Sequence, residues 1–112
     1  MRLFERSWVL LIENKILSML GLATKARKVV SGEFSVEKAV KEGKAVLVLV
    51  AEDASNNTKK LFTNMCAYYQ VPMYLLSNKE TLGHAIGKEI RASIAILDTG
   101  FANVIMKHMN GN

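Results

Sequence analysis

Residues 45–51 form an unbroken apolar run, Ala-Val-Leu-Val-Leu-Val-Ala, in which valine and leucine dominate. Because polar residues do not alternate with the apolar ones, the run has no face suited to water. It therefore predicts a central β-strand that is covered on both sides. Just before it, Gly43 ends a helical pattern whose apolar positions are Val36, Ala39 and Val40. A helix that leads into a doubly covered strand indicates a layered α/β domain.

The same alternation of helix and strand continues along the whole chain. Further strands are expected at about 28–30, 73–76 and 93–97, and helices at about 13–22, 33–42, 55–69, 79–87 and 100–109. This pattern predicts a three-layer α/β/α sandwich with a central mixed, mostly parallel sheet. The chain has 112 residues, half of them apolar, which is enough for one domain with its own core. We expect one domain over residues 13–112, preceded by an N-terminal extension of residues 1–12.

The extension does not resemble a targeting or anchoring segment. Its apolar run from Trp8 to Ile12 is far too short to span a bilayer. Charged residues precede this run, and no small-residue cleavage site follows before Lys15. We therefore expect no membrane partner. The extension is compatible with an added helical turn, an added strand or a disordered tail.

The cysteine and histidine content argues against a disulfide framework and against a metal site. The one cysteine, Cys66, cannot form an intramolecular disulfide, and no Cys/His cluster has zinc spacing. Cys66 is expected to be a small core residue. The absence of a disulfide framework suits a reducing cytosol, so we expect a cytoplasmic protein without a metal or another cofactor.

The positive charge is unevenly distributed along the chain. The net charge is +5, and residues 15–44 hold seven lysines and arginines against three glutamates. About a quarter of the chain thus carries most of the net charge. This asymmetry favours a polyanionic partner such as nucleic acid, although a generally basic, soluble surface explains the charge equally well.

Two acidic motifs are candidates for catalysis, and neither is convincing. The triplet Asp-Thr-Gly at 98–100 is that of aspartic proteases, whose chemistry needs two such carboxylates in an all-β fold. Here the triplet follows a strand and leads into the last helix, where Asp98 or Thr99 can serve as a cap. Glu52 and Asp53 follow the central strand, but Asp53 has an adequate role as a helix cap. Neither histidine has a partner at triad spacing. We expect no catalytic residue and no enzymatic activity.

The helix at 33–42 carries the most informative feature, an aromatic residue on its outer face. Phe34 lies about 200° from Val36 around the helix axis, so it faces away from the apolar stripe. Lys38 and Lys41 follow at i+4 and i+7 on the same outer face. An exposed aromatic ring can stack on an unpaired base, while lysines and helix amide groups can bind phosphate.

The surroundings of this helix strengthen the prediction of a nucleic-acid site. Ser31 or Gly32 can cap the helix, and Glu33 in its first turn complements the helix dipole. The basic connector Lys25, Arg27 and Lys28 precedes it. The alternative is that Phe34 packs on a neighbouring loop or on the extension, and that the lysines are merely solvated.

Several short motifs spread over the chain resemble those of a known family. In order, they are Ser31-Gly32, Val36-x-Lys38-Ala39, Gly43-Lys44-Ala45, Leu47 to Asp53, and Leu82-Gly83-x-Ala85-x-Gly87. This pattern resembles the L7Ae family of ribosomal and kink-turn RNA-binding proteins. The segment from Leu17 to Lys28 looks like the bacterial YlxQ-like branch of that family. The resemblance covers about residues 14–109.

The resemblance implies an α/β/α sandwich and an RNA partner, without catalysis or a cofactor. In the family, a turn and the following helix start read the sheared G·A pairs of a kink-turn, and an apolar loop covers a flipped-out nucleotide. The glycine of that turn corresponds to Gly32 and its lysine to Lys38. The loop corresponds to Ile90, Arg91 and Ala92, so that Arg91 adds a basic contact.

Two positions depart from the family's pattern. Phe34 stands at the position of the family's base-reading Asn, and Ser35 at the position of its Glu. A phenyl ring cannot hydrogen-bond to base edges, and serine reaches less far than glutamate. The two replacements weaken the expectation of kink-turn specificity more than that of RNA binding, because a stacked ring can restore affinity.

The expected function is that of a ribosomal-protein-like RNA-binding protein. Its partner would be rRNA or another structured, kink-turn-like RNA. The alternative is a protein-interaction module of ribosome or RNA-processing complexes that uses Phe34 as a protein anchor. The expected RNA-binding residues are Lys25, Arg27, Lys28, Gly32, Glu33, Phe34, Ser35, Lys38, Ile90, Arg91 and Ala92.

Overall fold

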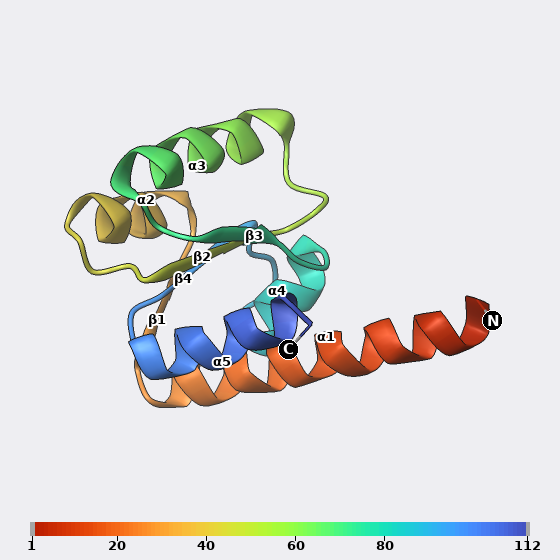
Figure 1. Ribbon diagram of the computed structural model, residues 1–112. Helices are drawn as coiled ribbons and strands as arrows, with labels where there is room; N and C mark the ends of the chain where they lie inside the picture. The colour runs from red at the N-terminus through yellow and green to blue at the C-terminus, as the bar shows by residue number, and fades with distance from the viewer. Residues whose placement is uncertain (1, 112) are drawn as a thin grey trace.

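The computed structural model describes the backbone of residues 2–111 and the side chains of residues 8–111. Helices and strands alternate along this part of the chain (Figure 1). In order they are α1 (Arg2–Lys25), β1 (Val29–Ser31), α2 (Glu33–Lys41), β2 (Leu47–Val50), α3 (Asn56–Tyr69), β3 (Met73–Leu75), α4 (Lys79–Ala85), β4 (Ser93–Ile96) and α5 (Thr99–Met109). Every helix and strand expected from the sequence is present.

The elements form three layers around one sheet, whose strand order is β1-β4-β2-β3. Helices α2 and α3 cover one face of the sheet, and α1, α4 and α5 cover the other (Figure 1). The two central strands, β2 and β4, are buried along their whole length. The predicted α/β/α sandwich is thus confirmed, with the apolar run that contains β2 at its centre.

Three of the four strands run in the same direction, and β4 is reversed. Strand β2 pairs with β3 in parallel, whereas β4 runs antiparallel to both β1 and β2. Because the reversed β4 lies between β1 and β2, two of the three strand pairs are antiparallel. The sheet is mixed, as predicted, but its pairing is mostly antiparallel.

The path of the chain around α4 explains this reversal. The amide of Lys79 at the start of α4 donates to Asp53 Oδ1, just beyond the carboxyl end of β2, at 2.9 Å. The carbonyl of the same Lys79 accepts a hydrogen bond from the amide of Arg91 at 3.0 Å. The segment between β3 and β4 therefore begins and ends near the carboxyl end of β2. Strand β4 starts at that end of the sheet, so it runs antiparallel to β2.

Helix α1 is much longer than the expected helix at 13–22. It runs through the expected start of the domain without a break, and its 24 residues span about 36 Å. Its buried residues Ile16, Leu20 and Ala23 all lie in its second half. The first turns project beyond the body of the domain (Figure 1). The backbone of residues 2–12 is helical, one of the three conformations considered, while Met1 and the side chains of residues 2–7 lie outside the described part.

Capping side chains fix where three of the helices begin. The Ser55 hydroxyl accepts from the amide of Thr58, and the Asn78 carbonyl oxygen accepts from that of Thr81. The Asp98 carboxylate accepts from the amide of Phe101 at 3.0 Å. The sequence offered Asp98 or Thr99 as the cap of the last helix, and the structure selects Asp98.

Candidate nucleic-acid interface

Helix α2 begins at a glycine whose conformation other residues rarely adopt. Gly32 has φ 92° and ψ 153°, and its amide donates to the carbonyl of Ser93 in β4 at 3.0 Å. No atom lies within 4 Å of the place where a Cβ would stand, so the requirement for glycine is conformational, not steric. Gly32 has no side chain with which to cap α2, and the first amide groups of the helix are therefore uncapped.

The outer face of α2 carries Phe34 as the sequence predicts. Its side chain is 80% exposed, which contradicts the alternative that it packs on a loop or on the extension. Phe34 and Lys38 line a shallow depression along the helix together with Glu37, Lys41 and Glu42. Glu33 and Ser35 flank Phe34 and are also exposed. The exposed ring of Phe34 thus lies about one helical turn from Lys38.

The two lysines on this face differ in their partners. Lys41 Nζ lies 2.8 Å from Glu37 Oε2, and this hydrogen-bonded carboxylate raises the pKa of Lys41. Lys38 makes no ion pair with any residue whose side chain the structure describes. Lys38 is therefore the cation on this face that is available to an anionic ligand without breaking an existing pair.

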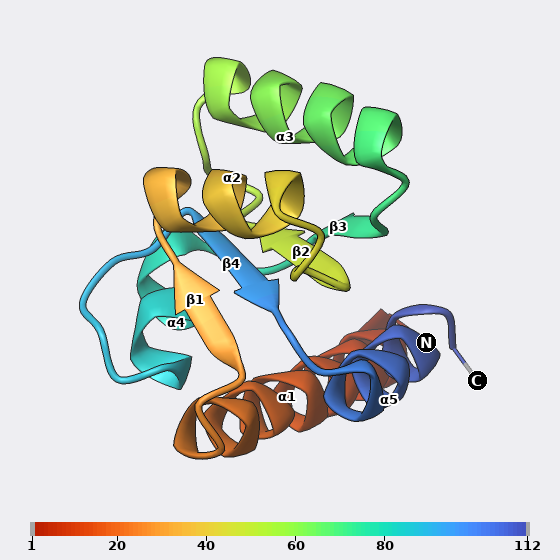
Figure 2. The same ribbon diagram turned by 90° about the vertical axis from the view of Figure 1, so that its left-hand side faces the viewer.

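Arg91 joins the loop before β4 to the start of α2. Its Nε donates to Ser31 Oγ at 3.0 Å, and its guanidinium also donates to the carbonyl of Ile90 at 2.7 Å. Ser31 immediately precedes Gly32, so these bonds hold a basic loop beside the uncapped helix. Figure 2 shows the start of α2 and the loop into β4 meeting on one side of the sheet. We call these residues, Gly32 to Lys38 with Ile90 to Ala92, the α2–loop surface.

Gly83 determines how closely that loop approaches α4. A Cβ on Gly83 would lie 2.6 Å from the carbonyl oxygen of Glu89 and 2.8 Å from the amide nitrogen of Ile90. The loop backbone can take this path only because residue 83 has no side chain. The result is that Ile90 stays 56% exposed beside Arg91, while the carbonyl of Ala92 accepts from Ala51 within the sheet.

The roles of Ser31 and Gly83 were not recognised in the sequence. Ser31 was considered only as a cap, and Gly83 only as part of a family motif. Both roles depend on contacts between residues far apart in the chain, for which the sequence carries no local signal. Gly83 followed by Gly87 near the end of one short helix was the available hint.

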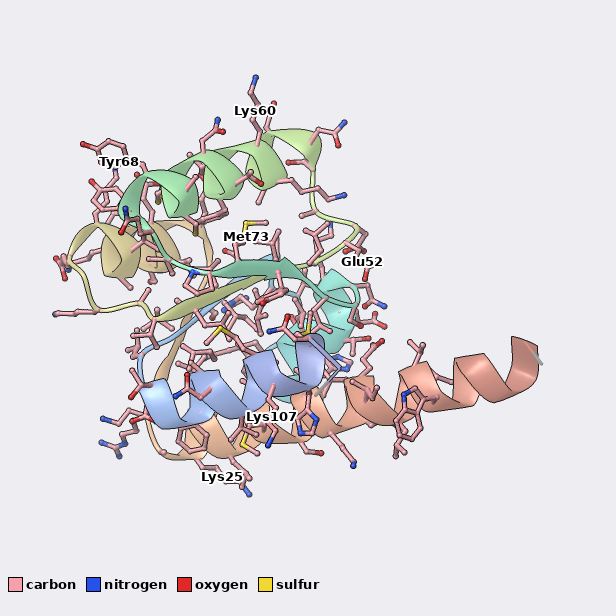
Figure 3. All side chains as sticks on the ribbon, viewed as in Figure 1. Lys25, Glu52, Lys60, Tyr68, Met73 and Lys107 are labelled. Atoms are coloured by element: carbon pink, nitrogen blue, oxygen red, sulfur yellow. The ribbon has the colours of Figure 1, made fainter. Side chains whose placement is uncertain are left out.

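The structure does not bring the basic connector to the α2–loop surface. Lys25, Arg27 and Lys28 lie at the opposite end of β1, where α1 ends, and β1 rises between the two places (Figure 2). All three side chains are exposed, and Lys25 points outward from the end of α1 (Figure 3). Because β1 has three residues, about 10 Å of strand separates the connector from Gly32. The expected site is therefore divided into two basic regions.

The residues weighed for catalysis have structural roles. Asp53 and Asp98 accept backbone hydrogen bonds at helix starts. Cys66 is buried, and this burial raises the pKa of its thiol to about 11, so it is not a ready nucleophile. His84 is exposed. Among residues with described side chains, no group of three or more histidine, cysteine or acidic side chains could hold a metal ion.

This fold and surface define a class of protein: a small α/β/α domain in which a helix start lies beside an exposed loop. Within that class, the chain belongs to the Ribosomal protein L7Ae/L30e/S12e/Gadd45 family, whose model matches residues 14–106. The family predicted from the sequence motifs is thereby confirmed. No helix in the described part of the chain is both long and apolar enough to cross a membrane.

Individual relatives agree with this assignment. RNA-binding protein YlxQ of Bacillus subtilis (strain 168) is 50% identical over 88 residues, which cover 79% of this chain and 88% of that protein. A solved structure of a protein with unknown function from Bacillus halodurans C is 41% identical with a TM-score of 0.83, and the match covers 86% of this chain and 97% of that one. The Giardia lamblia 15.5kD RNA binding protein has a TM-score of 0.76 at 21% identity, with coverage of 89% and 86%, and supports the fold alone. The predicted YlxQ-like branch is thus confirmed.

Proposed function

We propose that this chain is a ribosomal-protein-like RNA-binding protein that binds structured RNA through the α2–loop surface. The observation that carries the proposal is the hydrogen bond from Arg91 Nε to Ser31 Oγ. It joins an arginine and an exposed apolar loop to an uncapped helix start that bears an exposed aromatic ring. Phosphate and base ligands are therefore available on one surface, and the relatives named RNA-binding protein make RNA the favoured partner.

Each residue of the surface has a distinct role in the proposal. The uncapped amide groups of α2, Lys38 and the remaining donors of Arg91 bind phosphate oxygens. Phe34 stacks on an unpaired base, and Ile90 contacts the apolar face of an extruded nucleotide. Because a phenyl ring has no hydrogen-bonding groups, selectivity comes from RNA shape and from an available unpaired base. A kink-turn or a similarly bent RNA offers both.

The connector is a second, weaker contact in this proposal. Lys25, Arg27 and Lys28 bind the RNA backbone beyond the opposite end of β1, about 10 Å from Gly32. Such contacts add affinity and salt dependence without adding base selectivity. The RNA partner also favours a cytoplasmic location. The proposal includes no catalytic step and no cofactor, and it assigns RNA binding to residues 13–112, with 1–12 as an extension.

Phe34 provides the direct test, because Tyr68 on α3 is a matched control. Both rings are 80% exposed, and Tyr68 projects from α3 away from the sheet (Figure 3). We expect Phe34→Ala to weaken binding of a kink-turn RNA by roughly fivefold to a hundredfold, the range of about 1–3 kcal/mol per stacked base. Tyr68→Ala should leave the affinity unchanged. Gel shifts with the kink-turn RNA and a plain hairpin measure both affinity and selectivity.

Lys38 tests the phosphate contacts separately. Lys38→Ala should weaken binding of the kink-turn RNA and of the plain hairpin by the same factor. It should also reduce the steepness of log affinity against log salt concentration by about 1. Equal losses of RNA affinity in Phe34→Ala and Tyr68→Ala would contradict the assignment of RNA binding to the α2–loop surface. Failure of both RNAs to bind better than about micromolar at low salt would contradict RNA binding itself. Unchanged RNA binding, with a protein partner lost from Phe34→Ala in a pull-down, would support the interaction module instead.

A further inference from the structure

The projecting part of α1 exposes four consecutive large apolar side chains. Trp8, Val9, Leu10 and Leu11 are each between 46% and 59% exposed. Successive helical residues are rotated by about 100°, so four in a row point to every side of the helix. The body of one domain covers only one side. We call these four residues the α1 overhang.

An apolar groove lies directly beside the overhang. Its apolar lining comes from α1, the end of β3 with the residue that follows it, and the last turn of α5. It consists of Val9, Ile12, Ile16, Leu75, Leu76 and Met109. Glu13, Glu52 and His108 also line it, and Glu52 lies at the end of the sheet towards which α1 projects (Figure 3). Leu75 is itself largely exposed. The groove thus offers apolar surface of the kind that the overhang needs.

The exposed area is sufficient for association of two copies. At these exposed fractions, the overhang and Leu75 present roughly 500 Å² per chain, since one large aromatic side chain alone accounts for about 150–250 Å². Two copies would then bury about 1,000 Å², which is the lower limit for a specific interface. An exposed apolar patch of this size is often functional.

We propose that this protein forms a two-fold symmetric dimer in which the α1 overhang of each copy lies in the groove of the other. A two-fold interface requires one surface to be complementary to itself, and this patch carries a projecting helix and a groove side by side. It also carries both signs of charge, because Glu13 and Glu52 line the groove and Lys15 lines the adjoining pocket beside Trp8 and Leu11. The two-fold arrangement can therefore place opposite charges against each other around the apolar centre.

The dimer leaves the α2–loop surface free. The start of α2 and the loop into β4 lie on one side of the molecule, and the N- and C-terminal ends on the other (Figure 2). No residue of the overhang or its groove belongs to the α2–loop surface. Dimerisation is therefore independent of the proposed function, and each copy would carry its own RNA.

The experiment uses Trp8, which is the only tryptophan in the chain, as an internal probe. Tryptophan emission shifts to the blue when the indole leaves water, so the shift should follow protein concentration. Sedimentation equilibrium over a hundredfold concentration range should give a dimer with a dissociation constant on the order of micromolar. The emission shift and the sedimentation midpoint should coincide.

Two glutamate variants on the same helix provide a matched comparison. Leu10→Glu introduces a charge into the proposed interface. Leu22→Glu introduces the same charge outside the interface, at a leucine of similar exposure: Leu10 is 58% exposed and Leu22 is 52% exposed. Leu10→Glu should weaken dimerisation at least tenfold and abolish the emission shift. Leu22→Glu should change neither. Circular dichroism should show both variants folded, because both side chains face solvent.

Three results would overturn the dimer. The wild-type chain could remain a monomer across the whole concentration range, or Leu22→Glu could weaken association as much as Leu10→Glu. The Trp8 emission could also stay unchanged with protein concentration and shift only when phosphatidylcholine vesicles are added, which would assign the overhang to a lipid surface. RNA affinity of Leu10→Glu should equal that of the wild type, so the outcome is independent of the RNA experiments.

Discussion

Replacing Gly83 by alanine tests how the α2–loop surface is built. An added Cβ would lie 2.6 Å from the carbonyl oxygen of Glu89, so the loop must retreat by about 0.8 Å to restore ordinary contact at 3.4 Å. Overpacking of this kind costs about 1–3 kcal/mol. Alanine in a helix recovers up to about 1 kcal/mol relative to glycine. The net expectation is a loss of stability of about 0–2 kcal/mol.

Gly21 in α1 is the matched control, because it is also a helical glycine. A Cβ there would meet only the carbonyl oxygen of Ala85, at an ordinary contact distance of 3.5 Å. Gly21→Ala should therefore stabilise the fold by up to about 1 kcal/mol, which raises the melting temperature by about 4 °C. Thermal unfolding should therefore show a higher melting temperature for Gly21→Ala than for the wild type. For Gly83→Ala the melting temperature should be lower than that of the wild type or equal to it.

RNA binding completes this test. The loop displaced in Gly83→Ala carries Ile90 and Arg91, so its kink-turn affinity should fall severalfold, while Gly21→Ala should bind like the wild type. Equal stabilisation of both variants would show that the loop adapts without strain. A Gly83→Ala variant with unchanged RNA affinity would refute the argument that this close approach positions the loop.

Three further predictions follow from single residues. Arg27 and Gln70 adopt left-handed φ values of 62° and 58°, so replacing either by glycine should stabilise the fold by about 0.5–1 kcal/mol in urea unfolding; only Arg27→Gly should weaken RNA binding. Burial raises the pKa of Cys66 from 9.0 to about 11. As the pH rises, the unfolded chain therefore loses this proton before the folded chain does. The free energy of unfolding should fall between pH 9 and pH 11 by up to about 1.4 kcal/mol per pH unit. The Cys66→Ala variant should lack this additional fall. Asn78→Ala should cost about 1 kcal/mol through loss of the α4 cap, whereas mid-helix Asn64→Ala should cost nothing, as judged by thermal unfolding.

The elements that the sequence predicted are those fixed by local periodicity. The apolar run at 45–51 contains β2, because a segment without polar alternation must be covered on both faces. The exposure of Phe34 followed from its angular position relative to Val36 on the same helix. The cap Asp98 was similarly visible, because short polar side chains compete locally for helix amides.

Other features depended on contacts that no local pattern encodes. An apolar strand reads the same in either direction, so the reversal of β4 became evident only once the segment between β3 and β4 was seen to start at Lys79, beside Asp53, and to return to Lys79 at Arg91. The separation of the connector from Gly32 was likewise not visible in the sequence, because neighbours in sequence can lie at opposite ends of a strand. The continuity of α1 through Trp8 to Leu11 also had no clear signal, since its apolar residues follow no helical stripe.

Burial periodicity and motif order are properties of the chain, so the layers and the family could be predicted from the sequence alone. Which of the expected binding residues lie close together was visible only in the folded structure. Arg91 reaches Ser31 across sixty positions only because β4 returns beside β1. The same folding separates the connector from Phe34 and leaves Trp8 exposed beside a groove, because the distances between elements are set by packing and not by spacing in the sequence.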